Sequence, residues 1–366
     1  MTDLNDHLIK LIKLHGPITV SNYMTEALTN PKYGYYVNQN PFGKQGDFVT
    51  APEVSQMFGE MIGLWFADLW IKIGRPGKVH LIELGPGNGT LMVDILRVLE
   101  IVPDFIKAIE LHFVEAAPQL IDIQKEKFKE FNGNKTWHET VKPALLKASN
   151  EDEITFIIAN EFLDALPIRQ FQKGDLGWHE RMVTVGTDGK CLTNMLSPFP
   201  VLDTKLPEHL IDAEQHSIIE ISPIAEYLIA QIADHFKSHN GAALFIDYGY
   251  NENQTGETLQ AVEKHKYTDI FARPGYADIS AHVNFKKLID IARNKGIKSL
   301  GPENQGKFLN NMGIEERVRM LCEYASLEQK KDILEGLNRL IAPDEMGTLF
   351  KVMGLISRTD VDVAGF

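Results

Sequence analysis

Residues 83–89 place an acidic side chain before three closely spaced glycines, in the run Glu-Leu-Gly-Pro-Gly-Asn-Gly. Glycine lets a backbone turn sharply and lets a ligand approach without meeting a Cβ atom. A dinucleotide fingerprint, G-x-G-x-x-G, would need glycine at position 90, where this chain has Thr90. Pro86 also lacks the N–H group that a pyrophosphate would use. The run predicts a turn that binds another ligand through Gly85, Gly87 and Gly89, and the alternative is a tight turn without a ligand.

Two carboxylates are spaced to complete such a site. Glu83 ends a short apolar run, and Glu115 ends the next one, after a stretch long enough for one helix. The E-x-G-x-G-x-G turn resembles the first motif of class I methyltransferases that use S-adenosylmethionine. That cofactor carries an ammonium group, which suits an acidic residue, and two ribose hydroxyls, which a carboxylate can accept together. We therefore predict that Glu83 and Glu115 bind this cofactor, the alternative for Glu115 being a solvated strand end.

Beyond this turn, the whole chain resembles the MidA-like methyltransferases, a family that includes a mitochondrial complex I assembly factor with arginine methyltransferase activity. Asn88 and Tyr276 depart from the family pattern, which has arginine and an acidic residue there. The resemblance implies a seven-stranded methyltransferase sheet with an added lobe for a protein substrate. It also implies symmetric dimethylation of an arginine in the large hydrophilic complex I subunit beside the quinone site. The matching blocks are 46–56, 83–92, 159–167, 246–249, 278–282, 305–309 and 346–351.

A second polar group, Asn160, Glu161 and Asp164, follows an apolar run at 154–159. Methyl transfer to a cationic guanidinium needs carboxylates that orient it and accept a proton. Glu161 and Asp164 are three residues apart, so the first turn of a helix would put both on one face. We predict that Glu161 is the substrate carboxylate, that Asp164 supports it, and that Asn160 contacts the cofactor or a substrate amide. The alternative is helix capping by Asn160 beside an acid pair that the helix dipole favours.

Further candidates lie in three other segments. Asp247 ends another predicted strand at the same edge and is either a second catalytic acid or a residue that holds a loop. Gly46, Asp47 and Thr50 form a loop and helix start that we expect to cover the cofactor, although Thr50 and Glu53 also have capping-box spacing. His235 and His239 have i, i+4 spacing but lack a third ligand in sequence, so we predict no metal site.

These residues need elements that bring them to one sheet edge. Alternating apolar runs and helical patterns predict a doubly wound, Rossmann-like α/β sheet. A late antiparallel strand is expected at 350–356. Between 168 and 220, polar-alternating segments separated by an Asp-Gly pair predict an antiparallel β insertion. We predict an N-terminal helical segment at 1–76, a cofactor-binding core at 77–167 and 221–366, and an inserted α+β substrate lobe at 168–220.

Composition limits the classes of function. The 366 residues carry 37 Lys+Arg against 50 Asp+Glu, a formal charge of −13, which argues against a nucleic-acid partner. No apolar stretch is long enough to span a bilayer, and only two cysteines occur. Without a recognisable leader we expect a cytoplasmic protein of bacterial type, or a mitochondrial matrix protein if a leader has been removed. Two alternative functions are a non-catalytic assembly factor that binds S-adenosylmethionine, and an NAD oxidoreductase. The sequence is also compatible with a homodimer.

Overall fold

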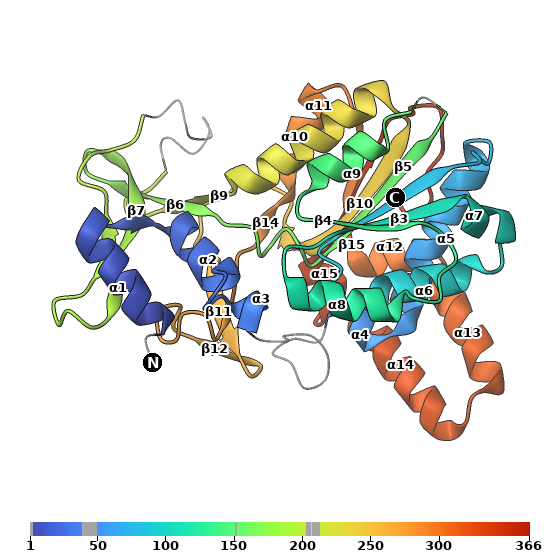
Figure 1. Cartoon of the computed structure of the whole chain (residues 1–366), viewed down its shortest axis with the longest axis horizontal. Helices are drawn as coiled ribbons and strands as arrows, with labels where there is room; N and C mark the ends of the chain where they lie inside the picture. The colour runs from blue at the N-terminus through green and yellow to red at the C-terminus, as the bar shows by residue number, and fades with distance from the viewer. Residues whose placement is uncertain (1–2, 39–49, 151, 203–205, 207–212) are drawn as a thin grey trace.

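The computed structural model describes residues 3–38, 50–150, 152–202, 206 and 213–366. A central sheet forms the larger part of the molecule, and a smaller lobe lies beside it (Figure 1). Seven of the eight strands described in this sheet follow one another in a continuous order. All neighbouring strands in the central sheet are parallel except the late strand, which is antiparallel to both of its neighbours. The predicted seven-stranded α/β fold is therefore confirmed. The order across the sheet is β15 (Lys298–Asn304), β16 (Phe350–Ile356), β10 (Gly241–Tyr250), β5 (Ile154–Asn160), β2 (Val79–Leu84), β3 (Ile109–Val114) and β4 (Lys135–His138).

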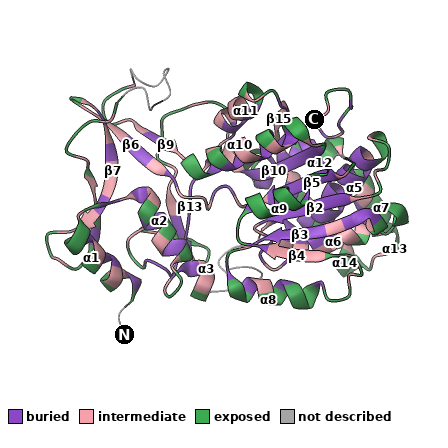
Figure 2. Cartoon of the chain, turned by 45° about the horizontal axis from the view of Figure 1, so that its top comes forward, coloured by how far each residue is buried: buried purple, intermediate pink, exposed green. Residues whose placement is uncertain are grey.

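Helices cover both faces of this sheet, because its central strands are apolar on both sides (Figure 2). Three helices pack on one face through a cluster that includes Ile229 and Leu288. These are α9 (Val141–Lys147), α10 (Pro223–Ser238) and α11 (Phe285–Asn294). The other face carries α5 (Gln56–Lys72), α6 (Thr90–Leu99), α7 (Pro103–Ala108), α12 (Gln305–Asn311), α13 (Ile314–Tyr324) and α14 (Leu327–Ile341). The remaining elements of this part are α8 (Pro118–Lys127), α15 (Met346–Leu349) and the short β14 (Val283–Asn284), which pairs with the end of β10.

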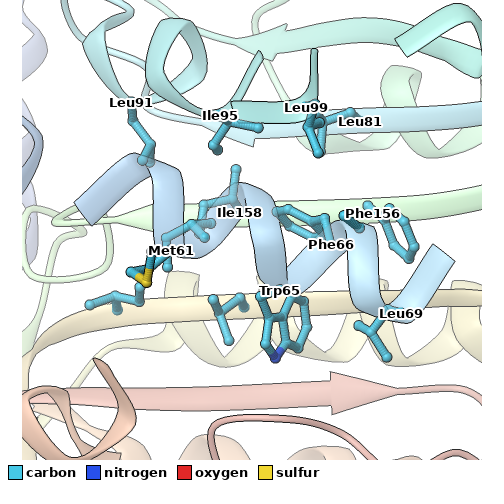
Figure 3. Close-up of a cluster of buried hydrophobic side chains, with 14 of the residues drawn as sticks. Met61, Trp65, Phe66, Leu69, Leu81, Leu91, Ile95, Leu99, Phe156 and Ile158 are labelled. Carbon is cyan, nitrogen blue, oxygen red and sulfur yellow. The ribbon is translucent and has the colours of Figure 1, made fainter. Parts of the chain in front are cut away.

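Helix α5 packs on the face of the sheet with α6 beside it (Figure 3). Trp65 and Phe66 are fully buried there, and the ring centroids of Phe66 and Phe156 are 5.1 Å apart. A helix that is apolar on all sides needs such a position in the middle of a core. None of the helices in the described ranges has both the length and the apolar character needed to cross a membrane.

The capping box predicted at Thr50 and Glu53 is wrong. Thr50 precedes α4 (Ala51–Val54) but its side chain caps nothing, and the chain becomes extended at Ser55 before α5 begins. The Glu53 carboxylate instead accepts a hydrogen bond of 2.7 Å from the hydroxyl of Thr90, at the start of α6. A contact with another element therefore replaces the local cap.

The smaller lobe confirms the predicted antiparallel insertion. Its main sheet has the order β1 (Ile18–Thr19), β7 (Gly177–Val185), β6 (Arg169–Gly174) and β9 (Ile218–Ile221), with β8 (Leu192–Leu196) also pairing with β7. A second small sheet, which the sequence analysis did not predict, consists of β11 (Gln260–Glu263), β12 (Lys266–Thr268) and β13 (Asp278–Ser280). The helices α1 (Leu4–His15), α2 (Val20–Thr29) and α3 (Tyr35–Asn38) complete this lobe.

The division into domains remains a proposal, and the hydrophobic clusters refine it. Leu8 of α1 and Tyr23 of α2 share a cluster with Ile168 and Val183 of the insertion. Trp65 of α5, by contrast, belongs to the cluster of the central sheet. We therefore propose that α5 belongs with the core and that the preceding helices α1 and α2 belong with the inserted strands.

Candidate active site

The glycine turn lies between β2 and α6, as predicted. Gly85, Gly87 and Gly89 have φ angles of 65°, 51° and 74°, in the left-handed region that favours glycine. A Cβ atom on Gly85 would lie 2.5 Å from Cδ2 of Phe162, and one on Gly89 would lie 2.8 Å from Cε2 of Phe128. Glycine is therefore required at positions 85 and 89 for two reasons, the backbone conformation and the close packing of neighbouring rings.

Two adjoining cavities open at this turn, and both are lined by Gly85, Gly87 and Glu161. The larger has a volume of about 300 Å³ and extends past Glu115 toward Leu120. The smaller has a volume of about 40 Å³ and is also lined by Thr50, Glu83, Asn88 and Asn160. The structure thus brings most of the predicted cofactor residues to one cleft at the carboxyl edge of the sheet.

Polar atoms around the smaller cavity fit the amino-acid end of S-adenosylmethionine. Oε2 of Glu83, Oδ1 of Asn88 and Oδ1 of Asn160 are buried and have no hydrogen-bond partner among the described residues. Burial raises the pKa of Glu83 to about 8, an effect that the nearby Lys127 opposes. Unpaired acceptors are costly in a folded protein unless a donor binds them. An ammonium group is such a donor, so this end of the cleft suits the cofactor.

Glu115 follows β3 and lines the larger cavity. Its Oε1 accepts a hydrogen bond of 2.9 Å from the backbone N–H of Ala117, and its Oε2 accepts one of 3.3 Å from Gln124. Burial raises the pKa of Glu115, and both hydrogen bonds oppose this shift. The sequence analysis missed Gln124, because a glutamine inside a helix has no chemical signature of its own.

The segment after β5 is a turn and not the predicted helix. Glu161 has a φ of 49°, in the left-handed region. The backbone N–H groups of Phe162, Leu163 and Asp164 all donate to Oδ2 of Asp247, at distances of 3.1, 2.9 and 3.2 Å. The carboxylate therefore satisfies three donors that a helix start would otherwise leave open, which supports the loop-holding alternative for Asp247.

Three acids meet at this turn, and each has a pKa above its ordinary value. Burial raises the pKa of Glu161 to about 7 and that of Asp164 to about 6, and it raises that of Asp247 as well. Oε1 of Glu161 accepts hydrogen bonds from the Ala51 N–H at 2.8 Å and from the Asn160 amide at 3.2 Å. Of these three acids, Glu161 lines both cavities, whereas Asp164 and Asp247 line neither.

The remaining predicted residues have varied positions. Gly46 and Asp47 lie outside the described residues. Thr50 lines the smaller cavity. Asn88 lines the same cavity, whereas Tyr276, the other departure from the family pattern, is 42% exposed, with the Arg273 guanidinium 4.5 Å from its ring centroid.

Histidines on the sheet are joined to one another by hydrogen bonds. One possible metal-ligating atom from each of His80, Glu110 and His112 lies within 4.8 Å of the others, a spacing that a metal ion could bridge. However, Nδ1 of His80 and Nε2 of His112 are 2.9 Å apart, and Nε2 of His80 is 2.7 Å from Glu153. Burial lowers the pKa of His112 to about 3, so its imidazole is neutral at neutral pH. The group is complete as a hydrogen-bonded chain without an ion.

The fold and the cleft together define a class of protein. A mostly parallel sheet has a glycine turn at its carboxyl edge and acids at the carboxyl ends of β2 and β3. This arrangement is that of an S-adenosylmethionine-dependent methyltransferase. Residues 61–303 match the family described as "Putative S-adenosyl-L-methionine-dependent methyltransferase", and this chain belongs to that family.

Curated relatives resemble the chain over nearly its whole length. It is 37% identical to the mitochondrial protein arginine methyltransferase NDUFAF7 of Xenopus tropicalis, over 99% of this chain and 89% of that protein. It is 35% identical to the human protein of the same name, over 97% of this chain and 84% of that protein. A Burkholderia thailandensis protein, crystallised with S-adenosyl-homocysteine, superposes with a TM-score of 0.84 at 27% identity, covering 99% of this chain and 93% of the other. These comparisons confirm the predicted fold, cofactor and class of enzyme.

Proposed function

We propose that this chain methylates an arginine side chain of a protein substrate, with Glu161 as the carboxylate that receives the guanidinium. The observation that carries this proposal is the position of Glu161, which lines both cavities, whereas Asp164 and Asp247 line neither. The relatives from Xenopus and human are named protein arginine methyltransferases, which supports arginine as the acceptor. The formal charge of −13 also favours a cationic target.

We also propose which residues hold the cofactor. Glu83, Asn160 and Thr50 hold its amino-acid end beside the glycines 85, 87 and 89, and Glu115 accepts the two ribose hydroxyls. When bound, S-adenosylmethionine supplies an electrophilic methyl group on a sulfonium. The chain contributes alignment of the acceptor, which can account for most of the acceleration of such a displacement.

Glu161 has the properties that a guanidinium acceptor requires. A methylated guanidinium nitrogen must lose a proton, and a base works best when its pKa lies near the operating pH. Burial raises the pKa of Glu161 to about 7, although the hydrogen bonds from the Ala51 N–H and the Asn160 amide oppose this shift. Asp164 adds negative charge behind it, and the Tyr248 hydroxyl donates to its Oδ2. Asp247 holds the turn that carries both acids.

The substrate that we propose is the large hydrophilic subunit of complex I beside the quinone site, with symmetric dimethylation of one arginine. This follows from the family resemblance. We assign the inserted strands to contact with this protein. The curated relatives are named mitochondrial, so their names favour the matrix over the cytoplasmic location that the sequence analysis expected.

The test is a transfer assay with the recombinant complex I subunit, followed by mass spectrometry of its peptides. We expect methylarginine and no methyllysine. Glu161→Gln should abolish transfer and still bind S-adenosylhomocysteine in a calorimetric titration. The matched change Glu252→Gln at an exposed site should leave both transfer and binding unchanged. Full activity of Glu161→Gln would reject its role. Cofactor binding by the wild type without any transfer would favour the non-catalytic assembly factor.

A further inference from the structure

The amide of Gln124 connects three segments of the cofactor cleft. Its Nε2 donates to the Gly87 carbonyl oxygen at 2.8 Å and to Oε2 of Glu115 at 3.3 Å. Its Oε1 accepts a hydrogen bond of 2.9 Å from Nε1 of Trp137, on β4. Gln124 is itself fully buried, on α8, and does not line the cleft. It therefore joins the glycine turn, the acid after β3 and the neighbouring strand.

The chemistry of the three partners allows only one orientation of this amide. An indole N–H can only donate, and a carbonyl oxygen can only accept. Oε1 of Gln124 must therefore face Trp137, and its NH₂ group must face Gly87 and Glu115. The indole ring is held in turn, because it stacks on Phe113 with the ring centroids 5.2 Å apart. Trp137 thus fixes the direction in which Gln124 donates.

The Glu115 carboxylate keeps acceptor capacity for a ligand. A carboxylate has about four acceptor sites, two on each oxygen. The Ala117 N–H donates to Oε1 and Gln124 donates to Oε2, and the Ala116 N–H also interacts with the carboxylate. A ribose presents two neighbouring hydroxyls, which can donate to the remaining capacity. The donors within the protein limit the rotation of the carboxylate, and Gln124 is the one that comes from a side chain.

We propose that Gln124 is a positioning residue, which Trp137 orients so that Glu115 accepts both ribose hydroxyls of the cofactor and Gly87 keeps its place in the turn. This rests on the assignment of Glu115 to the ribose under the proposed function. The protonation of Glu115 adds a smaller effect, which also weakens ribose binding when Gln124 is lost. Burial raises the pKa of Glu115, and the bond from Gln124 opposes that shift, so its loss favours a protonated acid that accepts hydroxyls less well.

The experiment is calorimetric titration with S-adenosylhomocysteine and with its 2′-deoxy analogue. Gln124→Met keeps the size of the side chain and removes its three hydrogen bonds, and we expect about tenfold weaker binding of S-adenosylhomocysteine. The analogue, which lacks one of the hydroxyls, should lose clearly less than tenfold. Trp137→Phe, which frees the amide to rotate, should show an intermediate loss for S-adenosylhomocysteine. The matched change Gln215→Met, at an exposed position outside the cleft, should leave both affinities unchanged.

Three results would overturn the proposal. Equal losses for both ligands in Gln124→Met would mean that the residue only supports the fold. Wild-type affinity in both Gln124→Met and Trp137→Phe would mean that neither matters. A wild type that binds the two ligands equally would remove Glu115 from the ribose and the proposal with it. Thermal unfolding of each variant checks that it folds, and if Gln124→Met does not, Trp137→Phe carries the comparison. Because no methyl transfer is measured, a failure to methylate arginine leaves this test unaffected.

Discussion

At the scale of single residues, the site depends on a carboxylate whose charge changes near neutral pH. Burial raises the pKa of Glu161 to about 7, and only the ionised form can accept a proton. We therefore expect the rate of methyl transfer to fall about tenfold per pH unit below this pKa and to level off above it. Initial rates at saturating S-adenosylmethionine, measured from about pH 5.5 to 9, test this prediction.

A matched binding measurement separates this effect from loss of the cofactor. Titration of S-adenosylhomocysteine over the same pH range shows whether the cleft stays occupied where the rate falls. A rate that is flat through neutral pH while binding holds would mean that Glu161 is not the base.

Residue types predicted part of this site, and burial determined the rest. Glu83, Glu115 and Glu161 were singled out because each lies at the end of a predicted parallel strand, and such ends meet at one edge of the sheet. Gln124 was missed because its role depends on Trp137, and nothing in either residue's own neighbourhood in the sequence indicates the pair. The pKa of Glu161 was likewise not predictable, because it follows from how completely the fold covers the side chain.

At the scale of elements, one carboxylate shapes the turn after β5. Asp247→Ala would leave the N–H groups of Phe162, Leu163 and Asp164 buried without an acceptor. Unpaired buried donors cost about 1–3 kcal/mol each, and we expect the free energy of unfolding to fall by about 3 kcal/mol in total, because the turn can relax. Urea unfolding of the variant measures this loss. A loss below about 1 kcal/mol would mean that the turn forms without Asp247.

The glycine turn allows a second test with a close control. Gly85→Ala forces a Cβ atom to 2.5 Å from the Phe162 ring and keeps the residue at a positive φ. We expect a stability loss of about 1–3 kcal/mol and a marked loss of affinity for S-adenosylhomocysteine. Gly77→Ala is the matched control, because its φ is not in the left-handed region and its Cβ would meet nothing within 4 Å. Equal effects of the two substitutions in calorimetry and urea unfolding would contradict this account.

The elements themselves were predictable where periodicity was strong. The apolar runs that became β2, β3, β5 and β10 lie in the middle of the sheet, where burial on both faces requires such runs. The small sheet of β11, β12 and β13 was missed, because its strands are short and carry polar residues. The helix expected at Glu161 was wrong for another reason. Asp247, on a strand far along the chain, offers the N–H groups of that segment a better acceptor than a helix would.

At the scale of the whole molecule, folding gathers five acids at one edge of the sheet. Each is buried enough that its pKa rises; they are Glu83, Glu115, Glu161, Asp164 and Asp247. Each therefore holds its proton more tightly in the folded chain than in the unfolded chain. The cofactor cleft accordingly lowers the stability of the molecule wherever the pH forces these acids to ionise.

Glu83→Gln tests this linkage between the site and the stability of the whole chain. The pKa of Glu83 rises from its ordinary value of 4.5 to about 8 on folding. Between these values the folded chain keeps a proton that the unfolded chain has released, so this group's contribution to stability is full below the lower value and is lost as the pH rises through the upper one. The glutamine side chain of Glu83→Gln does not ionise, so this variant does not lose stability at position 83 as the pH rises. In urea unfolding without cofactor, we expect Glu83→Gln to match the wild type near about pH 4.5 and to exceed it by at least about 1 kcal/mol at about pH 8.5. The exposed change Glu252→Gln should show no such gain. If Glu83→Gln and the wild type lose stability in parallel as the pH rises, Glu83 is already ionised in the folded chain, and the cleft carries a fixed negative charge before any ligand arrives.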